Sequence, residues 1–559
     1  MTLGRAPEQV DLWRSSAKYC EGKLSPTSIY SLLHRECHRL FPDDAFADLF
    51  QDIGRRSVPP RIVAVVMVLQ RLEGLSDREA VDRFTFDVRW KYAAGGLDLE
   101  YPSFVHTVLV DMRARLRGSE DPDRIFHAVL DVAKEAGIVG RRRVLDSTPL
   151  YDAVATQDTV TMIRSSIRGL LRVADEPLAT GLRAVLKRDD DYASAGKPAC
   201  DWEDKAAREA LVDALARDAY AVLAHLDGQQ LDEDVREAAA LVATVVGQDL
   251  EQTEDRRFRI ARRVAPDRVI STVDPEARHG HKTQARGFDG YKGHIALDPD
   301  SEIITSAGVT AANVGDGSVA KDLLQDVIPV AAELADAAAS TEPTSTAESQ
   351  EPAGAVSPAA SPEGAVAASE RVEVYGDASY GSAEVLTHLE HAGAVANVKV
   401  QSATAPDGHF TKDAFRIDLD NDTVTCPAGR LVPIRRREDG SGVASFGPAC
   451  KGCSMASSCT DAKAGRNIRL HKDERLLLEG RERQRSPEWR ASYKATRPKV
   501  ERKLAHLMRR RHGGRRSRMR GAVRTGHDFI LLCAAANLHR LAMLELRSVA
   551  APAAASAAV

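Results

Sequence analysis

The sequence has no run of eighteen or more apolar residues, the length that a membrane-spanning helix needs, so we expect no membrane association. Its first residues, MTLGRAPEQVDLWRSS, contain neither an apolar core nor a cleavage pattern, so we expect no secretion and a cytoplasmic location. Cysteine is scarce, with eight in 559 residues. Four of the eight are scattered and are predicted to be buried thiols, namely Cys20, Cys37, Cys200 and Cys533.

Charge is distributed unevenly along the chain. The sequence is 43% apolar and 28% charged, ordinary values for a globular protein of more than one domain, and its net charge is −4. Residues 451–550, however, hold 25 Lys and Arg against 9 Asp and Glu, a surplus of 16 that leaves about −20 on the rest. A basic segment on an acidic chain is typical of a surface that binds an anionic partner, and nucleic acid is the first such partner to consider. A solvated arginine-rich helix is the alternative.

Helical patterning dominates residues 1–140. A helix is predicted to end at Gly74, and a capping box from Ser76 to Glu79 begins the next one. This helix, turn and helix suits a DNA-reading unit and a plain helical bundle equally well. Residues 335–370, by contrast, are rich in Ala, Ser, Pro, Thr and Glu and lack aromatic residues, which predicts a disordered insert.

Strand signals mark a domain that other segments interrupt. Val144 and Leu145 predict a short strand with Asp146 at its end, residues 289–298 and 301–316 predict two more, and a fourth precedes Asp377. The expected parts are a first piece of an α/β core at 141–334 with a helical insertion at 155–265, a second piece at 371–400, a cysteine-rich insertion at 401–490, a C-terminal piece at 491–548 and a flexible tail at 549–559.

Three carboxylates occupy positions that can converge at one edge of a mixed sheet. Asp146 ends a strand, Asp377 follows a later strand, and Glu501 lies on a basic helix. Such carboxylates repel one another unless cations neutralise them, and hard oxygen ligands suit two Mg²⁺ or Mn²⁺ ions that cleave or form phosphodiesters. Taken singly, each has a plainer interpretation: a helix N-cap, a turn, and a salt bridge from Glu501 to Arg497.

Several motifs follow one another along the chain: SVPPRIVAVVMVLQRLEGLSDREAVDRFTFDVRWKYAAG, VLDSTPL, DPEARHGHKTQARGFDGYKGHIALD, VTAANVGD, YGDASYG, RPKVERKLAHLMRRRHGGRRSRMRG and AAANLHRL. With them the sequence resembles a bacterial insertion-sequence transposase of the DDE class, in the group with an InsH-type N-terminal domain and an inserted cysteine cluster. The resemblance covers nearly the whole chain except the 335–370 insert and both termini. It implies an RNase H-like core with a mixed sheet, an N-terminal helical DNA-binding domain, a helical insertion and a small cysteine-rich insertion.

The resemblance also assigns roles to individual residues. Asp146, Asp377 and Glu501 match the catalytic, metal-binding triad, and Arg497 matches an arginine that contacts DNA phosphate. Tyr493 stands one residue further from the arginine than the family's tyrosine does, and Met508 replaces an expected lysine. The other residues expected to contact DNA are Lys292, Arg509, Arg510, Arg511, Arg515, Arg516, Arg518 and Arg520.

The activity implied is cleavage of double-stranded DNA at the ends of the protein's own element, followed by strand transfer to a target. The N-terminal domain would recognise the terminal inverted repeats, and joining two ends would require a homodimer. Two alternatives stay open. One is an RNase H-like nuclease without strand transfer, and the other is a catalytically inactive, domesticated DNA-binding protein.

The remaining four cysteines cluster between Asp377 and Glu501. Cys426, Cys450, Cys453 and Cys459 follow a C-x23-C-x2-C-x5-C spacing. Four thiolates satisfy tetrahedral Zn²⁺, so the cluster predicts a structural zinc site, with free thiols as the alternative.

Overall fold

The computed structural model describes the chain from residue 1 to residue 544 with several gaps. The predicted insert at 335–370 and the predicted tail at 549–559 lie outside the described residues. The described ranges are 1–2, 5, 15–51, 53–152, 156–283, 285–328, 371–406 and 408–544.

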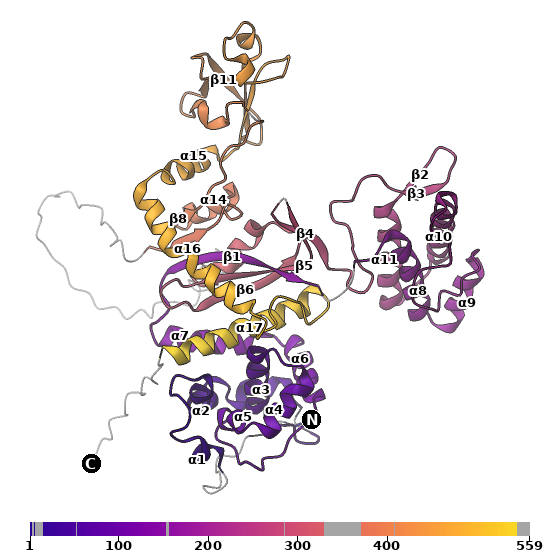
Figure 1. Ribbon diagram of the computed structural model, residues 1–559, viewed down its shortest axis with the longest axis vertical. Helices are drawn as coiled ribbons and strands as arrows, with labels where there is room; N and C mark the ends of the chain where they lie inside the picture. The colour runs from indigo at the N-terminus through magenta and orange to yellow at the C-terminus, as the bar shows by residue number, and fades with distance from the viewer. Residues whose placement is uncertain are drawn as a thin grey trace, which may run out of the picture.

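A mixed sheet occupies the middle of the molecule, between a helical unit formed by the N-terminal part and two further lobes (Figure 1). Its strands run in the order β8, β7, β1 and β5, with β4 and β6 both pairing with the far edge of β5. β5 is antiparallel to β1 and β6, whereas β7 and β8 are parallel to β1. The strands are β1 (Arg142–Tyr151), β4 (Arg278–Thr283), β5 (Arg286–Leu297), β6 (Ile304–Ala311), β7 (Glu373–Gly376) and β8 (Val395–Val398).

This order confirms the predicted fold class, an RNase H-like core in which three antiparallel strands are followed by two parallel ones. The prediction that the first strand ends at Asp146 is wrong. β1 continues to Tyr151, because the residues after Asp146 keep pairing with β5, as far as Tyr151 with Gly290. The ladder satisfies the backbone groups that a turn at Asp146 would have left to other partners.

The two faces of the sheet bury different sets of helices, because successive side chains of a strand point to opposite faces. Val144 and Ile295 lie in the core that contains side chains of α16 and α17. Leu145 and Ala296 lie in the core that contains side chains of α12 and α14. The flanking helices are α12 (Ala320–Leu323), α14 (Ala383–His391), α15 (Glu474–Arg483), α16 (Pro487–Leu507) and α17 (Ala522–Met543).

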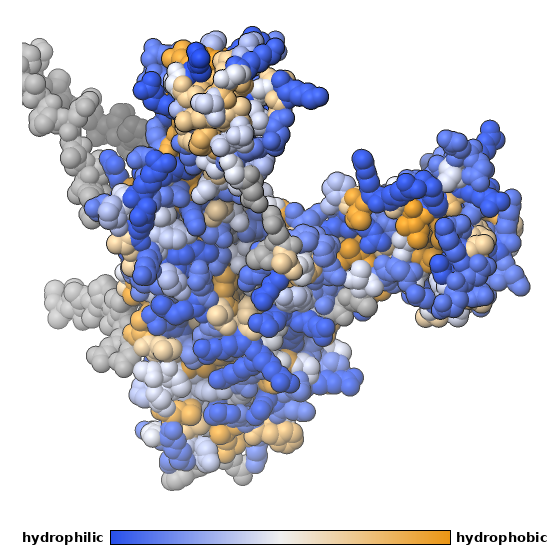
Figure 2. All heavy atoms as spheres, turned by 45° about the horizontal axis from the view of Figure 1, so that its top comes forward, coloured by the Kyte–Doolittle hydropathy of each residue, from blue (hydrophilic) through white to orange (hydrophobic). Residues whose placement is uncertain are grey.

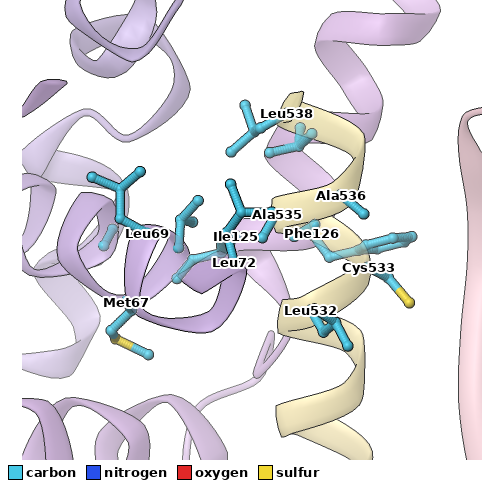
Figure 3. Close-up of a cluster of buried hydrophobic side chains, with 14 of the residues drawn as sticks. Met67, Leu69, Leu72, Ile125, Phe126, Leu532, Cys533, Ala535, Ala536 and Leu538 are labelled. Carbon is cyan, nitrogen blue, oxygen red and sulfur yellow. The ribbon is translucent and has the colours of Figure 1, made fainter. Parts of the chain in front are cut away.

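The N-terminal part forms a helical unit that shares its core with the sheet through α17. Figure 3 shows Leu69 and Leu72 of α3 and Phe126 of α7 beside Leu532 and Leu538 of α17. The predicted helix end and capping box are both present at the end of α3 and the start of α4. The elements are α1 (Ser16–Cys20), α2 (Ile29–Leu40), η1 (Asp43–Leu49), α3 (Pro60–Glu73), α4 (Asp77–Phe86), α5 (Val88–Ala93), α6 (Thr107–Arg117) and α7 (Arg124–Glu135).

The helical insertion lies between β1 and β4 and has a hydrophobic core of its own. The chain enters and leaves it at one place, where the amide of Gln157 donates to the carbonyl of Ile270 at 2.9 Å. Its last part is a two-stranded hairpin that the helical patterning did not predict. The elements are α8 (Thr159–Val173), α9 (Glu176–Val185), α10 (Lys205–Leu226), α11 (Glu233–Asp249), β2 (Leu250–Gln252) and β3 (Phe258–Ile260).

The cysteine-rich segment forms a five-stranded antiparallel sheet with a small core around Phe415, Ile434 and Phe446. Hydrophilic residues cover most of the face of the molecule in Figure 2. Within the described residues, no helix is long and apolar enough to cross a membrane. The strands are β9 (Arg416–Asp418), β10 (Thr423–Thr425), β11 (Leu431–Arg436), β12 (Gly442–Ser445) and β13 (Asn467–Leu470), and the short helices are η2 (Asp316–Val319), η3 (Lys412–Ala414), η4 (Gly447–Cys450) and η5 (Ala456–Ser458).

Candidate active site

The structure brings the three predicted carboxylates together from segments far apart in the chain. β1 and β7 are parallel, and Val144 lies opposite Tyr375. Asp146 and Asp377 each follow two residues later, so they lie at the same level of the sheet. Asp377 is the first residue after β7, where the strand has ended. Glu501 is on α16, which packs across β1 and β7.

Arg497 lies at the point where the three carboxylates meet. Its guanidinium binds both oxygens of Asp146, with Nη2 at 2.8 Å from Oδ1 and Nη1 at 3.0 Å from Oδ2. The same group is 3.8 Å from Oδ2 of Asp377 and 3.9 Å from Oε1 of Glu501, one helical turn later. The salt bridge from Glu501 to Arg497 and the convergence of the triad are therefore parts of one arrangement.

The site divides into a buried half and an open half. The side chains of Arg497 and Asp146 are 8% and 12% exposed, whereas those of Asp377 and Glu501 are 41% and 61% exposed. Burial raises the pKa of Asp146 above its ordinary value, although the guanidinium of Arg497 opposes the shift. Burial alone would lower the pKa of Arg497, but the hydrogen bonds and charge of Asp146 raise it. The two exposed carboxylates face solvent, where a substrate can approach them.

The donor set suits a hard divalent cation. Three carboxylates supply oxygen ligands of the kind that Mg²⁺ and Mn²⁺ prefer, and all three already surround one positive charge. In the conformation described, no three His, Cys, Asp or Glu side chains among the described residues are grouped closely enough to hold a metal ion. The guanidinium stands between the carboxylates, and Glu501, as an exposed side chain, has room to move.

Tyr493 holds α16 against the end of β7. Its hydroxyl donates to the carbonyl of Gly376, immediately before Asp377, at 3.2 Å. Its ring stacks on Trp489 with 4.7 Å between the ring centroids. Tyr493 is one residue further from Arg497 than the family's tyrosine is from its arginine. Within the helix this spacing places the two side chains about one turn apart. The structure thus places the predicted DNA-binding tyrosine between two elements of the site.

A second polar cluster lies on the other face of β1, behind Asp146. Asp316, at the start of η2, accepts a hydrogen bond from Ser147 at 2.6 Å and from Lys292 at 2.8 Å. Lys292 also donates to the carbonyl of Val314 at 2.7 Å, so this predicted phosphate contact is engaged within the protein. Sequence reasoning missed Asp316. The available signal was its place after the third strand, in the motif VTAANVGD that had marked the family.

His294 extends this cluster under the sheet. It is fully buried, and Nε2 lies 2.8 Å from the hydroxyl of Thr310. Burial lowers the pKa of His294 to about 4 and raises the pKa of the neighbouring Tyr380. Both side chains are therefore neutral at pH 7. The triad thus rests on a layer of buried polar groups that contains the ion pair of Lys292 and Asp316.

The segment from Arg509 to Arg520, called the arginine-rich segment below, follows α16 and runs along the end of β1. The amide of Tyr151 donates to the carbonyl of Arg515 at 2.9 Å, and the amide of Ser517 donates to the carbonyl of Tyr151 at 2.8 Å. Arg518 is half-buried and donates to the carbonyl of Leu75 in the N-terminal unit at 2.6 Å. Six arginines are exposed, and in the described part of the chain none has a carboxylate partner: Arg509, Arg510, Arg511, Arg515, Arg516 and Arg520.

The four clustered cysteines line one small pocket in the β-rich unit. The sulfur of Cys426 accepts from the amide of Arg430 at 3.3 Å, and that of Cys450 accepts from the amide of Arg466 at 3.5 Å. Burial and the neighbouring cysteines raise the pKa of the Cys459 thiol. All four are free thiols in the structure. Of the scattered cysteines, Cys20, Cys37 and Cys533 are buried as predicted, and Cys200 is only partly buried.

Comparison with protein-family models gives three matches. Residues 25–115 match a family described as a transposase domain, and residues 253–343 and 425–542 match two families that are both described as a transposase DDE domain. The last match contains Glu501 and the cysteine cluster, whereas Asp146 and Asp377 lie outside the matched residues. No curated protein and no solved structure matches the chain.

The fold defines an RNase H-like protein, and the matched domains place it within one class of such proteins. These matches confirm the resemblance to DDE transposases of insertion-sequence type that is seen in the motifs. Transposases act on DNA, and DDE domains generally use divalent metals such as Mg²⁺.

Proposed function

We propose that this transposase cleaves DNA at the terminal inverted repeats of its own insertion sequence and joins the free 3′-hydroxyls to a target. The observation that carries the proposal is the convergence of Asp146, Asp377 and Glu501 on one buried arginine at the open edge of an RNase H-like sheet. A turn or an N-cap accounts for one such carboxylate, and neither accounts for three from separate segments around a single cation.

In this proposal the three carboxylates hold two Mg²⁺ or Mn²⁺ ions. Such ions, when bound, activate a water or a 3′-hydroxyl and stabilise the leaving oxygen of a phosphodiester. Arg497 neutralises the buried Asp146 and keeps the triad assembled. Tyr493 fixes the helix that carries Glu501 against the strand that ends at Asp377.

Binding of the DNA backbone falls to the exposed arginines after α16, since phosphate contacts position DNA without reading its sequence. Their place beside the last residue of β1 puts Arg515 and Arg516 at the same sheet edge as the triad. The N-terminal helical unit would recognise the terminal repeats, and pairing of two ends would make a homodimer.

The test is Mg²⁺-dependent cleavage of a plasmid that carries the DNA flanking this gene. We expect the wild type to cut at the flanking ends and Asp377→Ala to lose at least about 100-fold in rate, because a metal ligand is removed. Glu237→Ala, an exposed carboxylate on α11, is the control and should cut like the wild type. Cleavage without joined products would indicate a nuclease, and DNA binding without cleavage would indicate an inactive DNA-binding protein.

For the cysteine cluster, we propose one structural Zn²⁺ held by Cys426, Cys450, Cys453 and Cys459. The supporting observations are the shared pocket and the backbone amides that already donate to two of the sulfurs. Purified protein should contain about one zinc per chain by elemental analysis, and Cys453→Ser should lose it, while Cys200→Ser should keep it. Wild-type protein without zinc, and with four thiols that react freely, would overturn this assignment.

A further inference from the structure

The hairpin of β4 and β5 projects beyond the rest of the sheet. Gly290 of β5 pairs with Tyr151, the last residue of β1, so the part of β5 before Gly290 has only β4 as a neighbour. β1 and β7 run parallel, and their carboxyl ends point the same way as this two-stranded ribbon. The ribbon therefore leaves the sheet at the edge that carries Asp377 and the arginine-rich segment.

The outer part of this ribbon carries positive charge that no carboxylate among the described residues neutralises. Lys282 and Arg286 are exposed, and among the described residues neither has a carboxylate partner. Asp289 is the ribbon's one acidic residue, and it is bound to His279 at 2.7 Å. Phe288, its one aromatic residue, is buried. Apart from the exposed imidazoles of His279 and His281, the outer part of the ribbon thus offers cations without an aromatic surface on which unpaired bases could stack.

A second pair of unpartnered cations directly precedes, in the chain, a segment that lines a groove together with the ribbon. Arg262 and Arg263 are exposed in the segment that leads from β3 back to β4, and in the described structure neither has a carboxylate partner. The nearby Asp267 is taken by Arg278 at 2.7 Å. The groove has a volume of about 840 Å³, and both elements line it, with Val264, Pro266 and Arg268 from the segment and Arg278, His279 and His281 from the ribbon.

The pairing register gives the distance from the triad to the ribbon's outer part. Asp146 pairs with Ile295, and Gly287 pairs with His281, so eight residues of β5 separate the two levels. At roughly 3.3 Å per residue this is about 26 Å. It corresponds to about eight base pairs of a double helix, which rises 3.4 Å per pair. Tyr151 pairs with Gly290, so it lies between the level of Asp146 and the level of Gly287. Arg515 and Arg516 lie beside Tyr151.

We propose that the β4–β5 ribbon and the Arg262–Arg263 segment form a second DNA-contacting surface, which binds the phosphates of duplex DNA about eight base pairs from the bond that the triad cleaves. The inference rests on the proposed function. It adds a partner surface that lies outside both the triad and the arginine-rich segment. Duplex DNA is favoured because the cations line up with the catalytic edge, and because the described residues of this surface expose no Phe, Tyr or Trp ring for single-strand stacking.

The test measures binding of a fluorescent 40-base-pair duplex from the flanking DNA at several salt concentrations. Each phosphate contact contributes about 0.9 to the slope of log K against log salt concentration. Two double variants remove two cations each: Lys282→Ala with Arg286→Ala, and Arg262→Ala with Arg263→Ala. In each of them the slope should therefore be less steep by about 1.8. Arg172→Ala/Arg183→Ala is the control, since it removes two exposed arginines from α8 and α9, and it should leave the slope unchanged.

Ethylation interference then locates the contact. Ethylated phosphates about eight base pairs from the cleavage point should block the wild type and have no effect on the two variants. Unchanged slopes with an unchanged interference pattern would overturn the inference, and leave the proposed function intact if the wild type still cuts DNA. An equal loss on a single-stranded 40-mer would overturn the duplex assignment. A wild type that neither binds nor cuts DNA would overturn both proposals.

Discussion

Arg497 supplies one positive charge to three carboxylates, and this makes it the residue on which the geometry of the site depends. The guanidinium is fixed by two hydrogen bonds to Asp146, while its contacts with Asp377 and Glu501 are longer. A bidentate pair is stronger and more directional than a single contact. Asp146 is therefore the carboxylate most dependent on Arg497, and Glu501 is the least.

We predict that Arg497→Gln lowers the free energy of unfolding by about 3 kcal/mol in the presence of a chelator, because a buried carboxylate loses its charged partner. Added Mg²⁺ should stabilise this variant more than it stabilises the wild type, since Asp146 then lacks an internal cation. Urea unfolding with and without Mg²⁺ measures both effects. The control is Arg502→Gln, whose partner Glu302 lies at 2.9 Å from an exposed guanidinium. It should cost at most about 1 kcal/mol, and equal losses in the two variants would contradict the prediction.

The residues of the site differ in how far they could be predicted. Asp146, Asp377 and Glu501 were predictable because their order and their motifs resemble a known family. The engagement of Lys292 was not predictable, because it depends on Asp316, which reaches it only after β6 has folded beside β5. The burial of Arg497 was also missed, since nothing in a sequence distinguishes a paired arginine from a free one.

At the scale of elements, the turn after α3 is one of the contacts between the N-terminal unit and the arginine-rich segment. Gly74 ends α3 with φ of +69°, a conformation that favours glycine. A Cβ at this position would lie 2.5 Å from the carbonyl oxygen of Arg511. Arg518 makes a further contact a few residues on, with Leu75. The path of the arginine-rich segment is thus set in part by the end of a helix more than 400 residues earlier.

Gly74→Ala should therefore destabilise the protein by more than its backbone strain alone, and we expect a loss of about 2–4 kcal/mol. Gly137→Ala isolates the strain, because Gly137 has φ of +67° and open space around it. It should cost about 1 kcal/mol. Thermal or urea unfolding of the two variants gives the difference, and DNA binding should weaken only in Gly74→Ala. Equal losses of stability would show that the contact with Arg511 contributes nothing.

Three histidines gather where α16, α17 and the arginine-rich segment meet. The ring of His506 stacks on that of His512 with centroids 4.9 Å apart, and His539 is 6.0 Å away. Burial, and then the charges around it, lower the pKa of His506 to about 4. The pKa values of His512 and His539 are lowered as well. These rings are therefore neutral in the folded protein over a pH range in which the unfolded chain takes up protons.

From this we predict that stability falls as the pH falls from about 6.5 towards 4. In this range the unfolded state binds more protons than the folded state, so the free energy of unfolding rises with pH. His506 alone should contribute about 1–2 kcal/mol between pH 7 and pH 5. Denaturant unfolding at pH 7, 6 and 5 tests the sign, and His506→Gln should show a shallower dependence. A dependence identical to that of the wild type would contradict the role of this histidine.

Element types were largely predictable, and element lengths were not. The helix end at Gly74 and the capping box at Ser76 follow from local chemistry, and both are present. The length of β1 depends on pairing with β5, whose partner residues lie more than 130 positions later in the chain. The hairpin of β2 and β3 was missed inside a stretch of helical patterning, because each of its strands is only three residues long.

For the whole molecule, the hydrophobic cores show which parts depend on one another. The N-terminal helices, one face of the sheet, α16 and α17 share one core. The helical insertion has a separate core. It meets the rest of the protein where Gln157 and Ile270 are hydrogen-bonded and where Asp267 binds Arg278. The first group should therefore unfold together, and the insertion should be separable from it.

Replacing residues 159–268 with a short glycine-containing turn should leave a folded protein that unfolds cooperatively. Removing residues 1–140 should instead give an insoluble chain, because Leu532 and Leu538 of α17 would lose their cover. Circular dichroism, size-exclusion chromatography and urea unfolding of both deletions provide the measurement. A soluble, cooperative product from the N-terminal deletion would disprove the dependence, and aggregation of the insertion deletion would disprove the separability.

The shared core of α3 and α17 also has a consequence for the newly made protein. Translation produces the N-terminal helices first, whereas α17 (Ala522–Met543), which completes their core, emerges from the ribosome only after the strands of the sheet. Domains with a core of their own can fold while synthesis continues. Here the helical insertion and the cysteine-rich segment have cores of their own, whereas the N-terminal unit does not. An interrupted translation product should therefore lack a folded N-terminal unit, and the chain should acquire the means to bind DNA and the means to cut it at nearly the same moment.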